Sequence, residues 1–475
     1  LYKNSAFQLL TYNCKSSQPL QGYLYEIILS NITVFFVDYD VWSRNYFESL
    51  FKQFLYRIKD STYGLNRTVQ KLRAKNKFLE EQIAKAKDIV QAQSFILKLM
   101  GVVKFQLIPG SQYQRILVAL KVLKILLESG LDSRIEKKFY DKKQATTSWC
   151  FNVDLVDESL IKLLLNTLTN SFTDVQILST NLLIMISSSE DLSNLAARHI
   201  DTLCLFQTGL QMLKSYNSTV SGSRVISFVV SSLLNSNKIS MLHDCICQRL
   251  VELENSIQIS NEDYLKGLDY PVDGYFLSLS SIMENDSSAF ETDTISKMVE
   301  AVKNNWVSTK GILCHDSSEG SLPLEYLNTG ISDQIITSYA YRSVKEASAL
   351  LETLLLSQKV LTTDQLAEVG SLLMEQLNLT RHSGAFQAVA PSFSACCAAI
   401  SNTNNNKLSC WLDEILQSMQ NKAQHITRRS GGLPFLVTAI LSSEPLKNER
   451  PLLHYTFREL LSIAQVPILK HEEKL

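Results

Sequence analysis

Apolar residues recur at every third or fourth position along most of this 475-residue chain, which is the spacing of one face of an α-helix. Residues 47–54 follow this pattern, and residues 67–87 predict a long, charged helix. Another helix is predicted after Pro109-Gly110-Ser111, with Ser111 as its N-cap. One face of that helix is expected to carry Ile116, Ala119, Leu120, Leu123, Leu126 and Leu127.

Helical segments alternate with short polar connectors from residue 150 onward. Residues 160–168 and 175–186 predict one helical pair, and Asp174 is expected at the start of the second helix, where a carboxylate interacts favourably with the helix dipole. Further pairs are expected over residues 197–235, 239–256, 276–304, 333–357, 364–377, 381–400 and 408–442.

One phrase of the sequence occurs twice. Thr380-Arg381-His382-Ser383-Gly384-Ala385-Phe386 returns 47 residues later as Thr427-Arg428-Arg429-Ser430-Gly431-Gly432-Leu433, and a looser echo is Tyr341-Arg342-Ser343-Val344-Lys345-Glu346-Ala347. Each copy is expected to open an apolar helix. A period of about 40–47 residues is typical of HEAT and armadillo units. The predicted fold is therefore all-α, a HEAT/armadillo-like α-solenoid of stacked helical hairpins, which is an architecture that presents long surfaces to other macromolecules.

Composition agrees with this fold. The chain has only 16 glycines and 9 prolines, so residues that break helices are scarce. Its nine cysteines are odd in number and irregular in spacing, which indicates reduced, buried thiols in a cytosolic or nuclear protein, and we expect a cytoplasmic one. The uncharged stretch 382–406 is interpreted as a packed helix pair rather than a membrane span. Because the chain begins at Leu1, we expect it to be part of a longer protein.

The net charge of −1 conceals a strong polarity along the chain. Residues 52–143 contain 20 Lys and Arg against 8 Asp and Glu, whereas residues 144–475 contain 23 against 35. We therefore divide the chain into N-terminal helical repeats (1–143) that carry a basic block (52–143) and a second helical-repeat region (144–475). The basic block predicts a polyanion site, because clustered cations attract phosphates.

Cations interleaved with aromatic residues, as in this block, are typical of surfaces that bind single-stranded or looped RNA. The candidate contacts are Arg67, Lys71, Arg73, Lys75, Lys77, Arg115, Lys137 and Lys138. The alternative is that these lysines and arginines form only a solvated helix face.

Enzyme motifs are missing from the sequence, which has no glycine-rich phosphate loop, no G-x-S-x-G and no H-E-x-x-H. His243-Asp244-Cys245-Ile246-Cys247 lacks the second ligand pair that a metal site needs, so no metal is expected. Cys314-His315-Asp316 contains the residue types of a thiol nucleophile and its base, but neighbouring side chains point apart. We interpret it as a loop or cap.

Pro434 and the two glycines before it indicate an interrupted backbone. The segment is either a kinked helix or the start of a new helix with Pro434 in its first turn. Unpaired backbone groups beside Arg428, Arg429 and Ser430 can hold a phosphate or a carboxylate of a partner. The alternative is that the two arginines connect neighbouring repeats by pairing with Asp or Glu.

The phrase Arg428-Arg429-Ser430-Gly431-Gly432-Leu433-Pro434 closely resembles the Arg-Arg-Ser-Ala-Gly-Leu-Pro signature of the thyroid adenoma-associated protein family, with Gly431 in place of alanine. Residues 107–115 and 313–320 resemble the same family, as does a secondary motif in which His382-Ser383 replaces the usual His-Arg. The resemblance covers roughly residues 100–465. The residues of the secondary motif are Arg342, Lys345, Glu346, Arg381 and His382.

The resemblance implies a scaffold without an active site or cofactor of its own. It would hold an FtsJ-like tRNA 2′-O-methyltransferase, which brings S-adenosylmethionine, and together they would methylate the ribose of nucleotide 32 in the anticodon loop of tRNA. The partners implied are thus that enzyme and the tRNA anticodon stem-loop, with no membrane. The alternative is an importin-like or chaperone-like HEAT-repeat adaptor that binds only proteins.

Overall fold

The computed structural model of the chain describes residues 2–465, except residues 76–78, 143–146, 194–200, 216, 236–238, 286, 316–321, 327–328, 358–360, 403–405, 423–430 and 445–449. It is 79% helical, and the described residues contain no strand. The prediction of an all-α repeat fold is confirmed. The chain forms two compact units, Leu1–Gly209 with Arg224–Asn237 and Leu210–Ser223 with Lys238–Leu475. The predicted division at residues 143 and 144 falls inside the first unit.

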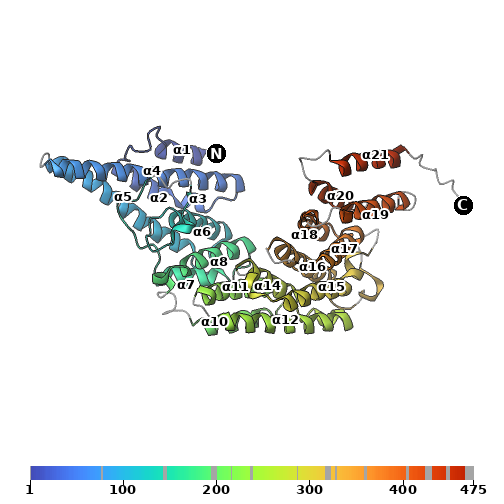
Figure 1. Cartoon of the computed structure of the whole chain (residues 1–475). Helices are drawn as coiled ribbons and strands as arrows, with labels where there is room; N and C mark the ends of the chain where they lie inside the picture. The colour runs from blue at the N-terminus through green and yellow to red at the C-terminus, as the bar shows by residue number, and fades with distance from the viewer. Residues whose placement is uncertain are drawn as a thin grey trace. The chain divides into compact units, whose positions relative to one another are not determined.

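The first unit is a stack of antiparallel helices, shown from blue to green in Figure 1. Aromatic rings pack together in the N-terminal part of its core. The ring centroid of Phe7 lies 5.4 Å from that of Phe35, 5.4 Å from that of Phe47 and 5.6 Å from that of Phe54. The helices are α1 (Tyr2–Thr11), α2 (Gly22–Asn31), α3 (Thr33–Phe36), α4 (Val41–Ala74), α5 (Leu79–Gln106), α6 (Tyr113–Glu128), η1 (Lys137–Phe139), α7 (Glu158–Thr167) and α8 (Thr173–Ser187), with α10 (Thr202–Met212) and α11 (Thr219–Asn235) divided between the units.

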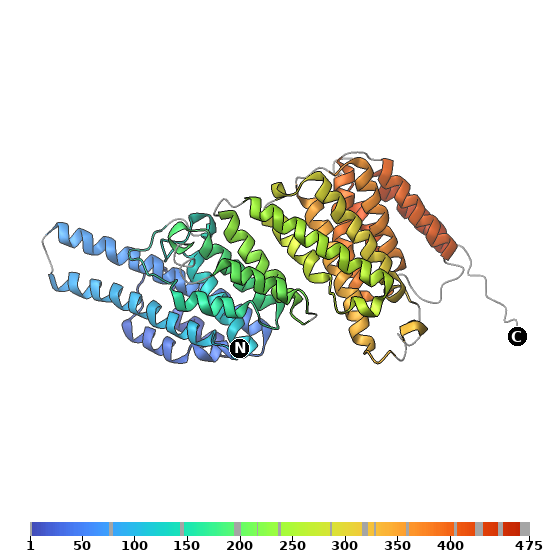
Figure 2. The same cartoon turned by 90° about the horizontal axis from the view of Figure 1, so that it is seen from below.

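Helices α4 and α5 form a hairpin that extends beyond the other helices of the first unit (Figures 1 and 2). Asp40 fixes the start of α4, because its carboxylate accepts hydrogen bonds from the main-chain N–H groups of Trp42 (3.2 Å) and Ser43 (3.0 Å). The single helix predicted over residues 67–87 is wrong, since α4 ends at Ala74 and α5 begins at Leu79. The charged residues continue through this boundary without glycine or proline, so the sequence carries no strong signal of the break.

The second unit is also built of helices packed against one another. Helix α16 packs against α14, α15 and α18, and α18 packs against α17 and α20. Its elements are α12 (Ile239–Glu262), α13 (Tyr264–Gly267), α14 (Asp273–Asn285), η3 (Ser287–Ala289), α15 (Thr292–Leu313), η4 (Leu324–Tyr326), α16 (Asp333–Leu356), α17 (Thr363–Leu379), α18 (Ser383–Ser401), α19 (Asn406–Lys422), α20 (Leu433–Ser442) and α21 (Pro451–Gln465).

Several predicted elements need correction. The pair over 160–186 is confirmed as α7 and α8, with Asp174 in the first turn of α8. The pairs predicted over 239–256, 333–357, 364–377 and 381–400 are each a single helix, because apolar side chains continue to face a neighbouring helix over the whole length. The N-cap of α6 is Gln112 rather than Ser111, whose N–H instead closes a turn on the carbonyl of Ile108 at 3.1 Å.

Candidate functional site

The exposed part of the basic block lies on the α4–α5 hairpin. Arg67, Lys71, Arg73 and Lys75 are exposed near the end of α4. Arg67 lies over the ring of Tyr63 at 5.8 Å, and Lys71, Arg73 and Lys75 make no ion pair with any described residue. Lys77 lies outside the described residues. Four of the predicted contact residues therefore lie together on one projecting element, where their charges are not neutralised by neighbouring carboxylates.

Many other cations of the block stabilise the fold instead. Ion pairs join Lys52 to Asp141 (2.5 Å), Lys104 to Asp157 (2.5 Å), Lys121 to Glu48 (2.7 Å) and Lys138 to Glu136 (2.6 Å). The buried Arg57 donates to the carbonyl oxygens of Thr11 (2.6 Å) and Gln18 (3.2 Å). Burial lowers the pKa of Lys59, whose ammonium donates to the carbonyl of Ser129 at 3.1 Å. The charge count of the sequence thus overstates the surface that is available to a polyanion.

The remaining predicted contacts lie on other elements. Arg115 is half-buried in the first turn of α6, and its Nε has no hydrogen-bond partner among the described residues. Lys137 and Lys138 are exposed in η1, where Lys138 pairs with Glu136 and lies 5.0 Å from the centre of the Phe139 ring. These three residues do not form part of the hairpin surface.

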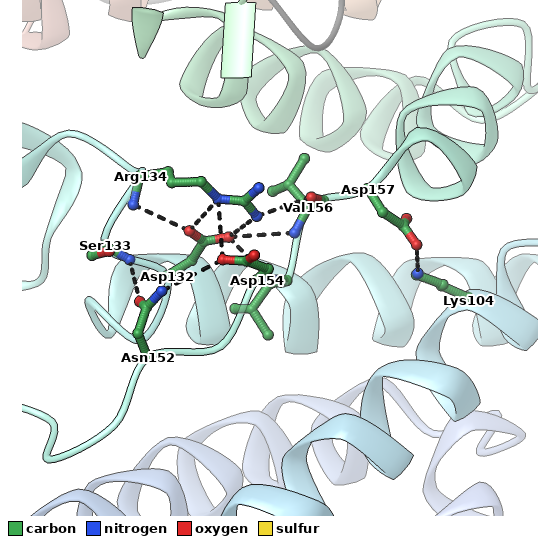
Figure 3. Close-up of polar contacts among 9 residues, drawn as sticks. Lys104, Asp132, Ser133, Arg134, Asn152, Asp154, Val156 and Asp157 are labelled. Atoms are coloured by element: carbon green, nitrogen blue, oxygen red, sulfur yellow. Dashed lines mark hydrogen bonds and ion pairs between the residues drawn. The ribbon is translucent and has the colours of Figure 1, made fainter. Parts of the chain in front are cut away.

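The connection between α6 and α7 is organised by one buried carboxylate, which Figure 3 shows. Asp132 accepts hydrogen bonds from the guanidinium of Arg134 (2.9 and 2.7 Å) and from the main-chain N–H of Leu155 (2.9 Å). Burial alone would raise the pKa of Asp132, but these hydrogen bonds and the charge of Arg134 outweigh it and hold that pKa below its ordinary value. Arg134 therefore has a structural role within the basic block.

In the second unit, the described part of the Arg-Arg-Ser signature begins a helix. Gly432 is the N-cap residue of α20 and Pro434 lies in its first turn, so the segment is a new helix start and not a kink. Arg428, Arg429 and Ser430 lie outside the described residues. A Cβ on Gly431 would lie 2.5 Å from the ring of Phe386, and one on Gly432 would lie 2.7 Å from the main-chain carbonyl carbon of Leu377. The glycines allow the backbone to pass close to α17 and α18.

The earlier copy of the phrase lies beside this helix start. Phe386 packs near Phe435 (ring centroids 5.8 Å apart), and the N–H of Arg381 donates to the carbonyl of Leu313 at 2.8 Å. Nε and Nη1 of Arg381 are buried and have no hydrogen-bond partner among the described residues. The structure thus brings together parts of three phrases that are separated in sequence, at residues 313–315, 380–386 and 431–435.

His382 has a structural role at the start of α18. Its Nδ1 accepts a hydrogen bond from the N–H of Ala385 (3.2 Å), and its ring lies 5.0 Å from that of Tyr341. Burial lowers the pKa of His382, so the neutral imidazole that the cap requires is favoured.

Arg342 of the secondary motif is held inside the second unit. Its guanidinium pairs with the carboxylate of Asp273 and donates to the hydroxyl of Thr219 at 2.6 Å. Lys345 pairs with the neighbouring Glu346 at 2.7 Å. The looser echo at 341–347 lies within α16, so the expectation that it opens a helix is wrong.

Other chemical candidates show no reactive arrangement. Burial raises the pKa of the Cys314 thiol to about 11, which disfavours the thiolate that a nucleophile needs. In the part of the chain that the structure describes, no group of three His, Cys, Asp or Glu could hold a metal ion.

Helix α18 is long and apolar enough to cross a membrane, but it is a single helix packed against α16, α17 and α20, which is the setting of a core helix. The predicted helix pair over 382–406 is thereby corrected.

Comparison with protein families places both ends of the chain in one group. Residues 2–177 match a family model described as Trm732, TPR repeats, and residues 293–474 match one described as THADA/TRM732, DUF2428. The chain belongs to the THADA/Trm732 family. The resemblance inferred from the Arg-Arg-Ser signature is confirmed, and for the N-terminal region the family description specifies TPR repeats.

Relatives in the THADA/Trm732 family are named as regulators of a methyltransferase. The chain is 28% identical over 98% of its length to the Schizosaccharomyces pombe tRNA (32-2′-O)-methyltransferase regulator trm732. It is 33% identical over 28% of its length to the tRNA (32-2′-O)-methyltransferase regulator THADA of Homo sapiens and of Gallus gallus. The alignments cover 32% of the fission yeast protein and 8% of each vertebrate protein, so the chain spans about a third or less of these relatives.

Among solved structures, an engineered protein from a structural genomics consortium matches with 12% identity and a TM-score of 0.25 over 97% of this chain and 94% of the other. A likeness this weak supports no conclusion.

Proposed function

We propose that this chain is a non-catalytic segment of a regulator of tRNA 2′-O-methylation. It contacts tRNA, through the anticodon stem-loop, and holds an FtsJ-like methyltransferase that binds S-adenosylmethionine and modifies the ribose of nucleotide 32. The names of the fission yeast and vertebrate relatives support the regulatory role. We place this activity in the cytoplasm.

The observation that carries the RNA contact is the charge of the α4–α5 hairpin. Lys71, Arg73 and Lys75 are exposed and have no ion-pair partner among the described residues, so a phosphate can replace water and counterions around them without breaking an internal salt bridge. Counterion release on binding makes such contacts strongly dependent on salt. Tyr63, against which Arg67 packs, adds an aromatic ring beside the cations.

The test is tRNA binding by the purified chain, measured by fluorescence anisotropy over a range of salt concentrations. The hairpin variant is Lys71→Glu, Arg73→Glu and Lys75→Glu. The matched control is Lys214→Glu, Lys407→Glu and Arg458→Glu, which reverses two exposed lysines and one exposed arginine of the second unit. The hairpin variant should bind more weakly, and its logarithmic salt slope should fall by about one unit for each phosphate that it no longer binds, whereas the control should change little.

Equally weakened binding in both variants would mean that only net charge matters. Unchanged binding by the hairpin variant, with its helicity retained, would leave the protein-only adaptor as the better explanation.

A further inference from the structure

Helix α5 has apolar residues on two opposite faces. Ala92, Phe95, Ile96, Leu99 and Val103 are buried against the rest of the first unit. On the other face, Leu79, Ile83, Val90 and Leu97 are 70%, 60%, 61% and 53% exposed. A helix that is apolar on both sides is normally covered on both sides. The second face of α5 has no such cover among the described residues.

The exposed residues form a straight stripe. Ile83, Val90 and Leu97 are spaced by seven residues, and Leu79 lies one turn before Ile83. Small residues lie between these apolar residues, three or four positions away from them. One of the small residues is Gly101, where an added Cβ would meet nothing within 4 Å. Phe105, 62% exposed, continues the stripe. From Leu79 to Phe105 the stripe is about 39 Å long, from a rise of about 1.5 Å per residue.

This pattern fits an α-helix as the occupant. A strict seven-residue repeat keeps its apolar residues in line with a second helix that winds around the first, and the large and small positions form the knobs and holes of such packing. The stripe is narrow and mostly aliphatic, whereas helices that lie on a membrane need a broad apolar face. Nucleic-acid bases stack on aromatic rings, which the central part of the stripe lacks.

The charged residues beside the stripe indicate which kind of partner helix would bind there. Lys87 and Lys98 are exposed along one side of the stripe and make no ion pair with any described residue. Together with Arg67, Lys71, Arg73 and Lys75 they outnumber the acidic groups of residues 67–106, which are Glu80, Glu81 and Asp88. Of these, Glu81 is already paired with Lys85 at 2.6 Å. Acidic residues of the partner helix would lie beside these lysines, at the edge of the apolar contact between the two helices. Charged residues pair in this way at the positions that flank the apolar contact of coiled coils.

We propose that the stripe formed by Leu79, Ile83, Val90 and Leu97 of α5 is a docking site for an acidic amphipathic helix of another polypeptide. The hairpin then has two functional sides, one on α4 that carries the cations proposed for tRNA and one on α5 that receives a protein. This docking site does not depend on the tRNA contact, because neither the stripe nor Lys87 and Lys98 belong to that set.

The test uses the 475-residue chain and two synthetic helical peptides of about four heptads. Both peptides have the same Ile and Leu residues at the heptad positions that would face the stripe. One peptide has Glu at the flanking positions and the other has Lys. We expect fluorescence anisotropy to show binding of the Glu peptide and at least about tenfold weaker binding of the Lys peptide, equivalent to about 1.4 kcal/mol. Ile83→Gln, Val90→Gln and Leu97→Gln together should abolish binding without lowering the melting temperature, because these side chains are exposed.

Two further variants complete the experiment. Lys87→Glu with Lys98→Glu leaves the stripe intact and should reverse the preference toward the Lys peptide. Val307→Gln, which changes an equally exposed apolar residue on α15, should leave binding unchanged. The proposal is overturned if the two peptides bind equally, or if the triple variant still binds the Glu peptide. It is also overturned if the stripe instead supports self-association in sedimentation or binding to phosphatidylserine vesicles.

Discussion

The main chain of Leu377 passes so close to Gly432 that a Cβ on Gly432 would lie 2.7 Å from the Leu377 carbonyl carbon. The obstacle is backbone at the end of α17 and cannot rotate away. At Gly431 the obstacle is the side chain of Phe386, which can turn.

This difference predicts unequal effects of alanine at the two glycines. Gly432→Ala should destabilise the second unit by about 1–3 kcal/mol, because overpacking forces the backbone to shift. Gly431→Ala should cost much less, and it restores the residue of the resembled signature. Chemical denaturation of the two variants checks this, and equal stability would show that the close approach to Leu377 is not maintained in solution.

Asp132 predicts a dependence of stability on pH. Its folded-state pKa lies below the ordinary value of 3.8, so its stabilising effect is present above that value and is lost as pH falls through the folded-state pKa. Unfolding free energy, followed between about pH 5 and pH 2, should therefore fall more steeply in the wild type than in Asp132→Asn. Parallel curves for the two proteins would show that Asp132 does not contribute to this pH dependence.

Arg342 predicts a stability effect rather than an RNA effect. Arg342→Ala leaves the buried carboxylate of Asp273 bonded to the Thr219 hydroxyl but without its cationic partner, a change that typically costs about 3–5 kcal/mol. Adding Asp273→Asn should restore part of this stability, because the uncompensated charge is removed. A melting temperature that is unaffected by Arg342→Ala, together with weaker tRNA binding, would instead make Arg342 a contact residue.

Arg428 and Arg429 are expected to serve the partner or the tRNA. A guanidinium forms two parallel hydrogen bonds with one carboxylate or phosphate, which lysine cannot reproduce. Arg428→Ala with Arg429→Ala should abolish ribose methylation and leave the melting temperature nearly unchanged. If the arginines instead join neighbouring repeats, the melting temperature should fall by an amount that reflects a few kcal/mol. Unchanged methylation with an unchanged melting temperature would contradict both interpretations.

The sequence predicted local features better than long-range ones. The apolar spacing of 160–186 and its polar connector predicted α7 and α8 correctly, since both signals are local. The structural role of several cations in the basic block was not predictable, because their partners are far away in the sequence. Lys52 forms an ion pair with Asp141, and Arg57 donates to the carbonyl oxygen of Thr11. The stripe on α5 did leave a signal, namely apolar residues on both faces of one helix, but only the structure shows which face is covered.

We propose that this protein regulates tRNA 2′-O-methylation without catalysing it. The most direct measurement is mass spectrometry of nucleotide 32 in tRNA incubated with S-adenosylmethionine and the FtsJ-like methyltransferase, with and without the protein. We predict 2′-O-methylation when both proteins are present, little with the enzyme alone and none with this protein alone. Equal methylation by the enzyme alone, or methylation by this protein alone, would contradict the claim.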